Sequence, residues 1–302
     1  MVEMPDAPKY MDEVTVYDVQ DAKTGEHISV FMTDYFPRAS KRQGAWMEEM
    51  QSAGVYENGE YKRPIVYNVG NFTRPAGDTP ALLTLDEVET TFHEFGHALQ
   101  GMLTRAPYKS LAGTHVDRDY VEMCSQINEH WATDPEVLKI YARHYQTGEP
   151  MPQELIDKMQ AASKFNQGFT VTELTGAALL DLAWGKTDGE NINVPEFESV
   201  FAEKIGMPKE ITYRYRSPYF KHIFGDDGYA SGYYTYLWAQ VLEADGWELF
   251  EEKGIFDPKT AASFKKNILE SGDTEDPMVL FERFRGHKPD AKALLRLRGL
   301  DK

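Results

Sequence analysis

Two histidines, His93 and His97, lie four residues apart in the segment TFHEFGHALQ (91–100), and Glu94 directly follows the first of them. On an α-helix this spacing places both imidazoles on one face, where they can converge on a single cation. Glu94, about 100° further round such a helix, can approach a water molecule bound to that cation. Two helical histidines at this spacing also occur by chance, so a catalytic zinc site requires a third ligand elsewhere in the chain.

A second helix is predicted within GTHVDRDYVEMCSQINEHW (113–131), and it carries candidates for the third ligand. The 3.6-residue repeat of an α-helix places Glu122 and Glu129 on one face of this helix. We choose Glu122 as the third ligand. We expect Glu129 to hydrogen-bond to one of the metal-binding histidines and so orient its ring. Spacing alone leaves alternatives open, because the same glutamates could form a solvated acidic face. Three other histidines are suitable ligands by their chemistry: His115, His130 and His144.

A tyrosine-rich segment, GYASGYYTYLW (228–238), could stabilise developing negative charge. Tyr229, Tyr233 and Tyr236 occur at positions i, i+4 and i+7, which predicts one face of a helix, whereas Tyr234 points elsewhere. A phenol hydroxyl is a neutral hydrogen-bond donor suited to an oxyanion. By itself, however, an aromatic stripe at this spacing is more often part of a hydrophobic core.

The elements that must position these residues divide into a β-containing head of about residues 1–80 and a helical part of about residues 81–302. Strands are predicted at VTVYDV (14–19) and HISVFMTDYF (27–36), joined by a hairpin loop, and at PIVYNV (64–69). Thr84 and Glu87 form a capping box for a helix of about residues 85–103. Asp-Pro pairs predict three further helix starts, at Asp134, Asp257 and Asp276. One compact, mainly α domain with a small sheet accounts for these signals.

Composition restricts the classes of partner. The chain has 302 residues, of which 41% are hydrophobic, as expected for a folded globular domain. The net charge of −17 disfavours nucleic acid and anionic membranes as partners. No apolar run is long enough to span a bilayer, and the acidic N-terminus lacks the apolar core of a secretion signal. The single cysteine, Cys124, is compatible with a reducing compartment, and we expect a cytoplasmic location.

The motifs together resemble the zinc peptidases of the thimet oligopeptidase family. The resemblance rests on TLDEVETTFHEFGHALQGM (84–102), DYVEMCSQINEHW (119–131) and the tyrosine-rich segment, and it extends from about residue 14 to the C-terminus. Two further stretches, INEHWATDPEVLKIYARHYQTGEPMP and RYRSPYFKHIFGDDGYASGYYTYLW, are most similar to the peptidyl-dipeptidase branch, also called dipeptidyl carboxypeptidase. The implied fold is a zincin-like (gluzincin) catalytic domain.

The resemblance also implies roles for individual residues. In that family, two histidines of the first helix and the glutamate of the second motif bind one zinc ion, and the matching residues are His93, His97 and Glu122. The glutamate after the first histidine is the general base, here Glu94. The family also uses tyrosines of the 228–238 segment, with a preceding histidine, to bind the substrate and the transition state. The matching residues are His222, Tyr229, Tyr233 and Tyr236.

An enzyme acting on peptides also needs groups that hold the peptide backbone and its end. The stretch PIVYNVGNFTRP (64–75), with Gly70 and Asn71, is predicted to be an edge strand onto which an extended peptide adds, although an ordinary sheet strand would have the same pattern. Arg214 and Arg216 are candidates for binding a terminal carboxylate, whereas surface arginines without a ligand are commoner.

The chain departs from the family at individual residues and in its length. Cys124 stands where proline is usual, Gln100 stands where histidine is usual, and HIFGDDGY carries two aspartates in place of glycines. The family's helical N-terminal half, which closes over the cleft, is absent, so we expect self-association or pairing with that half.

Taken with the resemblance, the sequence predicts a zinc metallopeptidase that releases C-terminal dipeptides from short peptides. The alternatives are an endopeptidase of the oligopeptidase A type and a non-catalytic zinc-bearing half that binds a peptide or a complementary chain.

Overall fold

The computed structural model describes residues 1–225 and 227–301. It contains a five-stranded sheet in the order β1-β2-β3-β7-β4, formed by Val2–Glu3, Thr15–Gln20, His27–Asp34, Ile65–Val69 and Trp46–Gln51. A separate two-stranded hairpin consists of β5 (Gly54–Val55) and β6 (Tyr61–Lys62). Asp226, one of the two aspartates in HIFGDDGY, lies outside the described residues.

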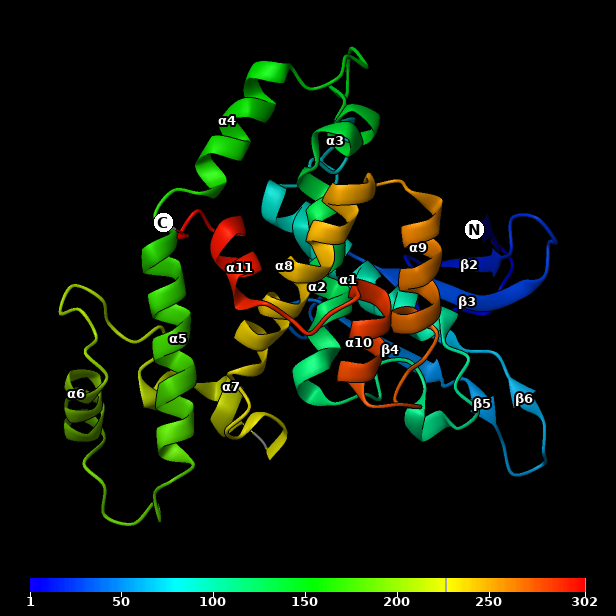
Figure 1. Ribbon diagram of the computed structural model, residues 1–302. Helices are drawn as coiled ribbons and strands as arrows, with labels where there is room; N and C mark the ends of the chain where they lie inside the picture. The colour runs from blue at the N-terminus through cyan, green and yellow to red at the C-terminus, as the bar shows by residue number, and fades with distance from the viewer. Residues whose placement is uncertain (226, 302) are drawn as a thin grey trace.

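Most of the described chain beyond residue 84 is helical. The α-helices are α1 (Leu85–Leu103), α2 (Arg118–Thr133), α3 (Pro135–Tyr141), α4 (Gln153–Ser163), α5 (Gln167–Trp184), α6 (Val194–Lys204), α7 (Lys221–Phe224), α8 (Thr235–Lys253), α9 (Pro258–Phe264), α10 (Pro277–Arg285) and α11 (Ala291–Leu297). Figure 1 places α1, α2 and α8 centrally, with the sheet on one side and α5 and α6 on the other. The mainly α class with a small sheet is confirmed, and no described helix has the length and apolar character needed to cross a membrane.

The predicted helix starts are confirmed by their caps. Thr84 Oγ1 accepts a hydrogen bond from the Glu87 backbone N–H, and the Glu87 carboxylate accepts one from the Thr84 backbone N–H at 2.8 Å. This reciprocal pair satisfies two N–H groups that the first turn would otherwise leave unpaired. The three Asp-Pro pairs also begin helices, in each case with the aspartate side chain as cap: Asp134, Asp257 and Asp276.

The prediction that 64–75 forms an edge strand is wrong. β7 lies inside the sheet, parallel to β3 on one side and antiparallel to β4 on the other. The edge on this side of the sheet is β4, whose sequence WMEEMQ contains no β-branched residue and therefore has low strand propensity. A register shift between Glu49 and Gln51 bends this strand, as is common at sheet edges.

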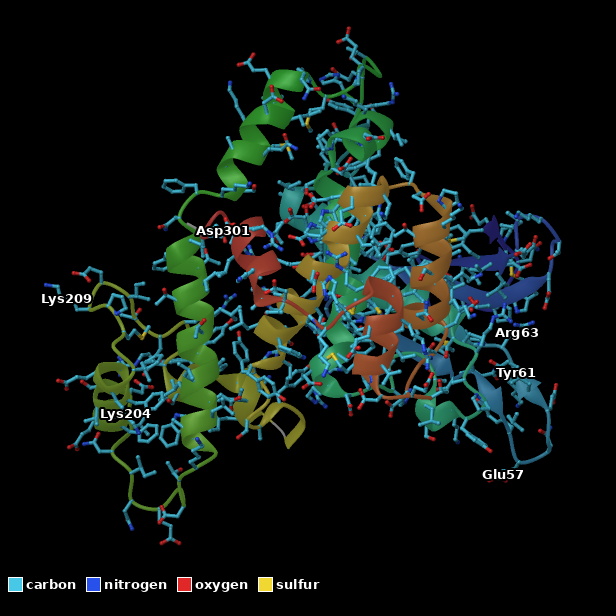
Figure 2. All side chains as sticks on the ribbon, in the orientation of Figure 1. Glu57, Tyr61, Arg63, Lys204, Lys209 and Asp301 are labelled. Carbon is cyan, nitrogen blue, oxygen red and sulfur yellow. The ribbon has the colours of Figure 1, made fainter. Side chains whose placement is uncertain are left out.

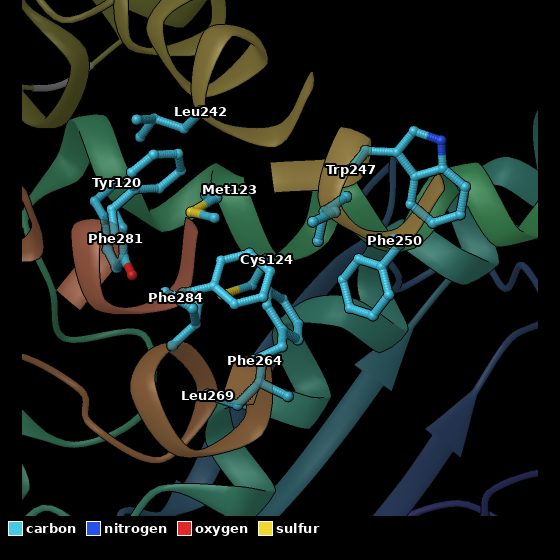
Figure 3. Packing of buried hydrophobic residues seen from close by; sticks show 12 residues of the cluster. Tyr120, Met123, Cys124, Leu242, Trp247, Phe250, Phe264, Leu269, Phe281 and Phe284 are labelled. Carbon is cyan, nitrogen blue, oxygen red and sulfur yellow. The ribbon is translucent and has the colours of Figure 1, made fainter. Parts of the chain in front are cut away.

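Two packed layers hold the central helices in place. Ala98 and Met102 of α1 pack against Phe31 and Val66 of the sheet, so one face of α1 is anchored to the strands. The largest cluster of buried side chains joins α2 and α8 to α9 and α10, and Figure 3 shows Met123 and Cys124 among aromatic rings of these helices. Burial of such aromatic side chains is a main source of stability. In contrast, the β5–β6 hairpin and α6 extend at opposite sides of the molecule (Figure 2).

A buried ion pair fixes the loop between β3 and β4. The Lys41 ammonium donates hydrogen bonds to Asp34 Oδ1 at 2.8 Å and to the carbonyls of Asp34, Phe36 and Gly70 at 2.9, 2.6 and 2.9 Å. The side chains of Lys41 and Asp34 are each only 1% exposed. Arg38 forms two more hydrogen bonds to the same carboxylate. The ends of β3 and β7 are thereby tied to the loop that leads into β4.

Candidate metal centre and active-site cleft

His93, His97 and Glu122 come together as predicted, on two helices that cross. Their potential ligand atoms all lie within 4.8 Å of one another. Glu122 Oε2 is 3.3 Å from His93 Nε2 and 3.2 Å from His97 Nε2. Two imidazole nitrogens and one carboxylate oxygen form a ligand set typical of catalytic zinc, which leaves a coordination position open. The residues present therefore fit this metal.

Hydrogen bonds from surrounding residues orient these ligands. Glu129 Oε1 lies 2.6 Å from His93 Nδ1, which leaves Nε2 directed toward Glu122. Ser125 Oγ donates a hydrogen bond to Glu122 Oε2 at 2.9 Å. Burial alone would lower the pKa of His93, but Glu122 and Glu129 outweigh it and raise that pKa to about 10. The two carboxylates thus create a potential that favours positive charge at the histidine, as a metal site requires.

The glycine before the second histidine sets the distance between the two helices. A Cβ atom on Gly96 would overlap the Cys124 carbonyl and lie 2.7 Å from Ser125 Cα. Because both obstacles are backbone atoms of α2, no side-chain rotation could relieve the overlap. Gly96 therefore allows α2 to approach closely enough for Glu122 to reach the histidines.

We expect Gly96→Ala to weaken metal binding and to destabilise the fold by about 1–3 kcal/mol, because α1 and α2 must move apart. Denaturant unfolding and the metal content of the purified protein measure the two effects. Gly168→Ala is a suitable control, since Gly168 lies in helix α5 and nothing lies within 4 Å of an added Cβ there. Unchanged metal content and stability in the Gly96→Ala variant would show that close contact between α1 and α2 at Gly96 is not required.

Glu94 lies on the same helix as the two histidines but does not belong to the ligand group. Its side chain is buried beside the metal ligands, against the start of β4. Burial raises the pKa of the Glu94 carboxyl, while the nearby histidines and the Met47 backbone partly offset this increase. A carboxylate with a raised pKa, placed beside the ligands without binding the metal, is suited to accept and return a proton.

A second group of side chains faces the metal ligands from α7 and α8. His222 Nε2 lies 3.1 Å from the Tyr236 hydroxyl, and the His222 ring is 4.5 Å from that of Tyr229. The Tyr229 and Tyr236 rings stack with centroids 6.2 Å apart. Burial and the Tyr229 hydroxyl raise the pKa of Tyr236, so it remains a protonated donor at neutral pH. These three residues line one cleft of about 470 Å³ with the metal ligands and Glu94. We call it the metal cleft.

The prediction that three tyrosines share one helical face is wrong. Tyr229 ends a short 3₁₀ turn, Tyr233 precedes α8, and Tyr236 lies within α8. The buried carboxylate of Asp181 accepts hydrogen bonds from the backbone N–H groups of Ser231 and Tyr233 at 2.9 and 2.8 Å. Ser231 also adopts a positive φ of 57°, which breaks the helical path. This turn brings the Tyr229 and Tyr236 rings, but not that of Tyr233, into the lining of the metal cleft.

The remaining candidates lie at varying distances from the metal cleft. Tyr233 is buried against Phe220 and does not line the cleft. Asn71 Nδ2 donates hydrogen bonds to the carbonyls of Arg42 and Gly44 at 2.9 and 2.7 Å, so this amide holds the loop before β4. Gly70 contributes its carbonyl to Lys41. Arg214 lies 3.6 Å from Glu173, Arg216 pairs with the buried Glu198, and neither lines the metal cleft.

Sequence reasoning missed several residues of the cleft. Trp46 and Met47 enter from β4, and Arg118 enters from the first turn of α2. Arg118 could have been found from its spacing, because it lies four residues before Glu122 and so on the same helical face. Trp46 and Met47 belong to a strand that the pattern did not reveal. Gln100 and Cys124, which depart from the family pattern, are buried and lie outside the ligand group.

Comparison with known proteins gives consistent results. The profile of Peptidase family M3 matches residues 1–300. Dipeptidyl carboxypeptidase from Salmonella typhimurium is 44% identical over 306 residues, covering 100% of this chain and 44% of that protein. Oligopeptidase A from the same organism is 39% identical over 301 residues, covering 99% of this chain and 44% of that protein. The chain thus spans less than half the length of these relatives. A solved structure of Pyrococcus furiosus carboxypeptidase shares the fold, with a TM-score of 0.56, 18% identity and coverage of 89% of this chain and 53% of that chain.

Proposed function

Because this chain belongs to Peptidase family M3, we propose that it hydrolyses short peptides and releases dipeptides from their free C-termini. The observation that carries the proposal is one cleft in which a ligand group, a buried carboxylate and a histidine–tyrosine pair face one another. The similarity to a dipeptidyl carboxypeptidase favours dipeptide release. Short peptides are the proposed substrates, and the net charge of −17 does not favour nucleic acid.

One zinc ion per chain would be held by His93 Nε2, His97 Nε2 and Glu122 Oε2. When bound, zinc lowers the pKa of a coordinated water to about 7 and polarises a carbonyl group. Glu129 keeps the His93 ring in the required orientation through Nδ1. Ser125 does the same for the Glu122 carboxylate.

Glu94 acts as the general base. Its carboxylate accepts a proton from the attacking water and then gives that proton to the nitrogen of the leaving amine. Its burial limits contact with bulk water and raises its pKa, which favours uptake and return of the proton. The two transfers balance, so the carboxylate is regenerated for the next substrate.

Negative charge that develops on the attacked carbonyl oxygen needs donors from the other wall of the cleft. The Tyr236 hydroxyl and the His222 ring are the proposed donors on that wall. The hydroxyl oxygen lies 3.1 Å from His222 Nε2. Tyr229 stacks on Tyr236 and holds its ring. Donors that are already in place stabilise such charge without reorganisation.

The edge strand β4 is the proposed binding site for the peptide backbone, in place of the 64–75 segment. Trp46 and Met47 line the metal cleft, and β4 is paired on one side only, with β7. An extended peptide can add to such a free edge through main-chain hydrogen bonds. Asn71 then supports substrate binding through the loop before β4.

Pairing with a further chain segment is also proposed. The relatives are more than twice as long as this chain, and a cleft of about 1040 Å³ separates α4 from α8 and α11. Several apolar side chains nearby are exposed, among them Leu85, Leu155 and Phe165. Such surfaces commonly mark protein contacts. Sedimentation velocity of the purified chain tests for self-association.

The buried Cys124 thiol favours a reducing compartment such as the cytoplasm.

Hydrolysis of a free-C-terminus peptide and its C-terminally amidated twin by the zinc-loaded chain tests the proposed activity. Products are identified by mass. We expect a dipeptide from the free form and little turnover of the amidated form. Internal cleavage of both forms would favour the oligopeptidase A-type alternative, which the 39% identity also supports. Zinc binding without any turnover would favour the non-catalytic, peptide-binding alternative.

A further inference from the structure

Arg118 occupies a position in the metal cleft that the proposed reaction does not yet use. It begins α2, four residues before Glu122, and its side chain is exposed. Its Cζ atom lies 4.5 Å from the centroid of the Tyr229 ring. Among the described residues that line the cleft, Arg118 alone carries a guanidinium or ammonium group.

We propose that Arg118 binds the C-terminal carboxylate of the peptide substrate and thereby fixes the length of the released fragment. This inference rests on the proposed function, which requires a device that recognises a free C-terminus. A guanidinium forms two parallel hydrogen bonds to a carboxylate, a geometry that distinguishes it from an amide. An uncharged, amidated terminus cannot form the same pair.

The distances agree with the release of two residues. Arg118 lies four residues before Glu122, which corresponds to about 6 Å along the helix axis. An extended dipeptide spans about 7 Å. A peptide with its scissile carbonyl at the metal ligands can therefore place its terminal carboxylate, two residues further on, within reach of the Arg118 side chain.

The surroundings of Arg118 leave its charge available. No described residue forms an ion pair with it at 4.0 Å or less. Of its acidic sequence neighbours, Asp117 lies outside the helix at the N-cap position, and Asp119 accepts a hydrogen bond from the Tyr234 hydroxyl at 3.3 Å. The N–H groups at the start of α2 add positive potential at the same place.

Tyr229 gives the guanidinium a defined position. The guanidinium carbon lies over the Tyr229 ring, a cation–π contact that helps to fix the group and uses none of its N–H donors. Arg214 and Arg216, predicted from sequence for this role, are instead held by Glu173 and Glu198 outside the cleft lining.

The test compares kcat/KM for the free and amidated peptides in the wild-type chain, Arg118→Met and Arg118→Lys. We expect Arg118→Met to lose about 10- to 100-fold on the free peptide, mainly through KM, and to leave the amidated peptide unchanged. The ratio between the two substrates should therefore approach one. Arg118→Lys keeps the charge but not the paired donors, and it should retain an intermediate ratio.

The control variant is Arg283→Met, which removes an exposed arginine paired with Glu275 on α10 and should retain the wild-type ratio. Zinc content and thermal unfolding establish that each variant is folded. The inference would be overturned if Arg118→Met kept the wild-type ratio of kcat/KM for the free peptide to kcat/KM for the amidated peptide. It would also be overturned if kcat/KM fell equally for both peptides. Failure of the proposed function is distinguishable, because the wild-type chain itself would then show no preference for a free C-terminus.

Discussion

Glu94→Gln is expected to lower kcat/KM for peptide hydrolysis by about 10²- to 10⁴-fold, with zinc content unchanged. The amide has the same shape as the carboxylate but cannot accept the proton of the attacking water. Glu94 lies outside the ligand group, so the metal should remain bound. Steady-state kinetics and metal analysis of the same preparation measure both quantities.

Glu89→Gln provides a matched control for this variant. Glu89 lies on the same helix, and burial raises its pKa as it does that of Glu94, but it lines the cleft beside α4. It should retain activity close to that of the wild type. If Glu94→Gln kept activity within about threefold, a different group would have to be the base.

Lys41→Met is expected to destabilise the folded state by about 3–5 kcal/mol. Methionine removes the charge and all four hydrogen bonds of the ammonium, and it leaves three backbone carbonyls without this donor. Because the same loop leads into β4, activity should fall as well. Urea unfolding followed by circular dichroism measures the loss of stability.

The exposed ion pair between Lys158 and Glu154 supplies the control. Lys158→Met should change stability by no more than about 0.5 kcal/mol, because exposed pairs contribute little. An equal, small effect of both substitutions would mean that the Lys41 pair does not stabilise the fold.

The acid limb of the stability profile should depend on the same pair. Burial alone would raise the pKa of Asp34, but hydrogen bonds from Lys41, Arg38 and Tyr10 lower it overall. The folded-state pKa thus lies below the unfolded value of about 3.9, so this stabilisation is present above that pH and is lost as the pH falls through the folded value. Lys41→Met should reduce this dependence.

The meeting of His93, His97 and Glu122 could be predicted only in part from helical spacing. His93 and His97 needed only a helix, and the capping box at Thr84 and Glu87 located its start correctly. Glu122 required a second helix, and spacing left it beside other candidate ligands; the resemblance to the thimet oligopeptidase family selected it. Their meeting in space depends on Gly96, whose purpose is visible only once α2 is placed against it.

The edge strand and the tyrosine cluster could not be predicted by the same means. β4 forms because β7 offers it an unpaired edge, whereas its own residues favour a strand only weakly. The tyrosine spacing fitted a helix, but Asp181, about fifty residues earlier in the chain, holds the turn that interrupts it. Both elements are decided by long-range contacts, which local patterns do not contain.

Because the candidate ligands lie on both α1 and α2, which cross at Gly96, metal binding at this site would be thermodynamically linked to folding. A cation bound by His93, His97 and Glu122 acts as a crosslink between helices that belong to different packed layers, one facing the sheet and the other facing α8. Any ligand that binds the folded chain alone raises its stability in proportion to the logarithm of ligand concentration. If the proposed site binds a cation, the free-metal concentration should therefore set the stability of the folded chain as well as the occupancy of the site.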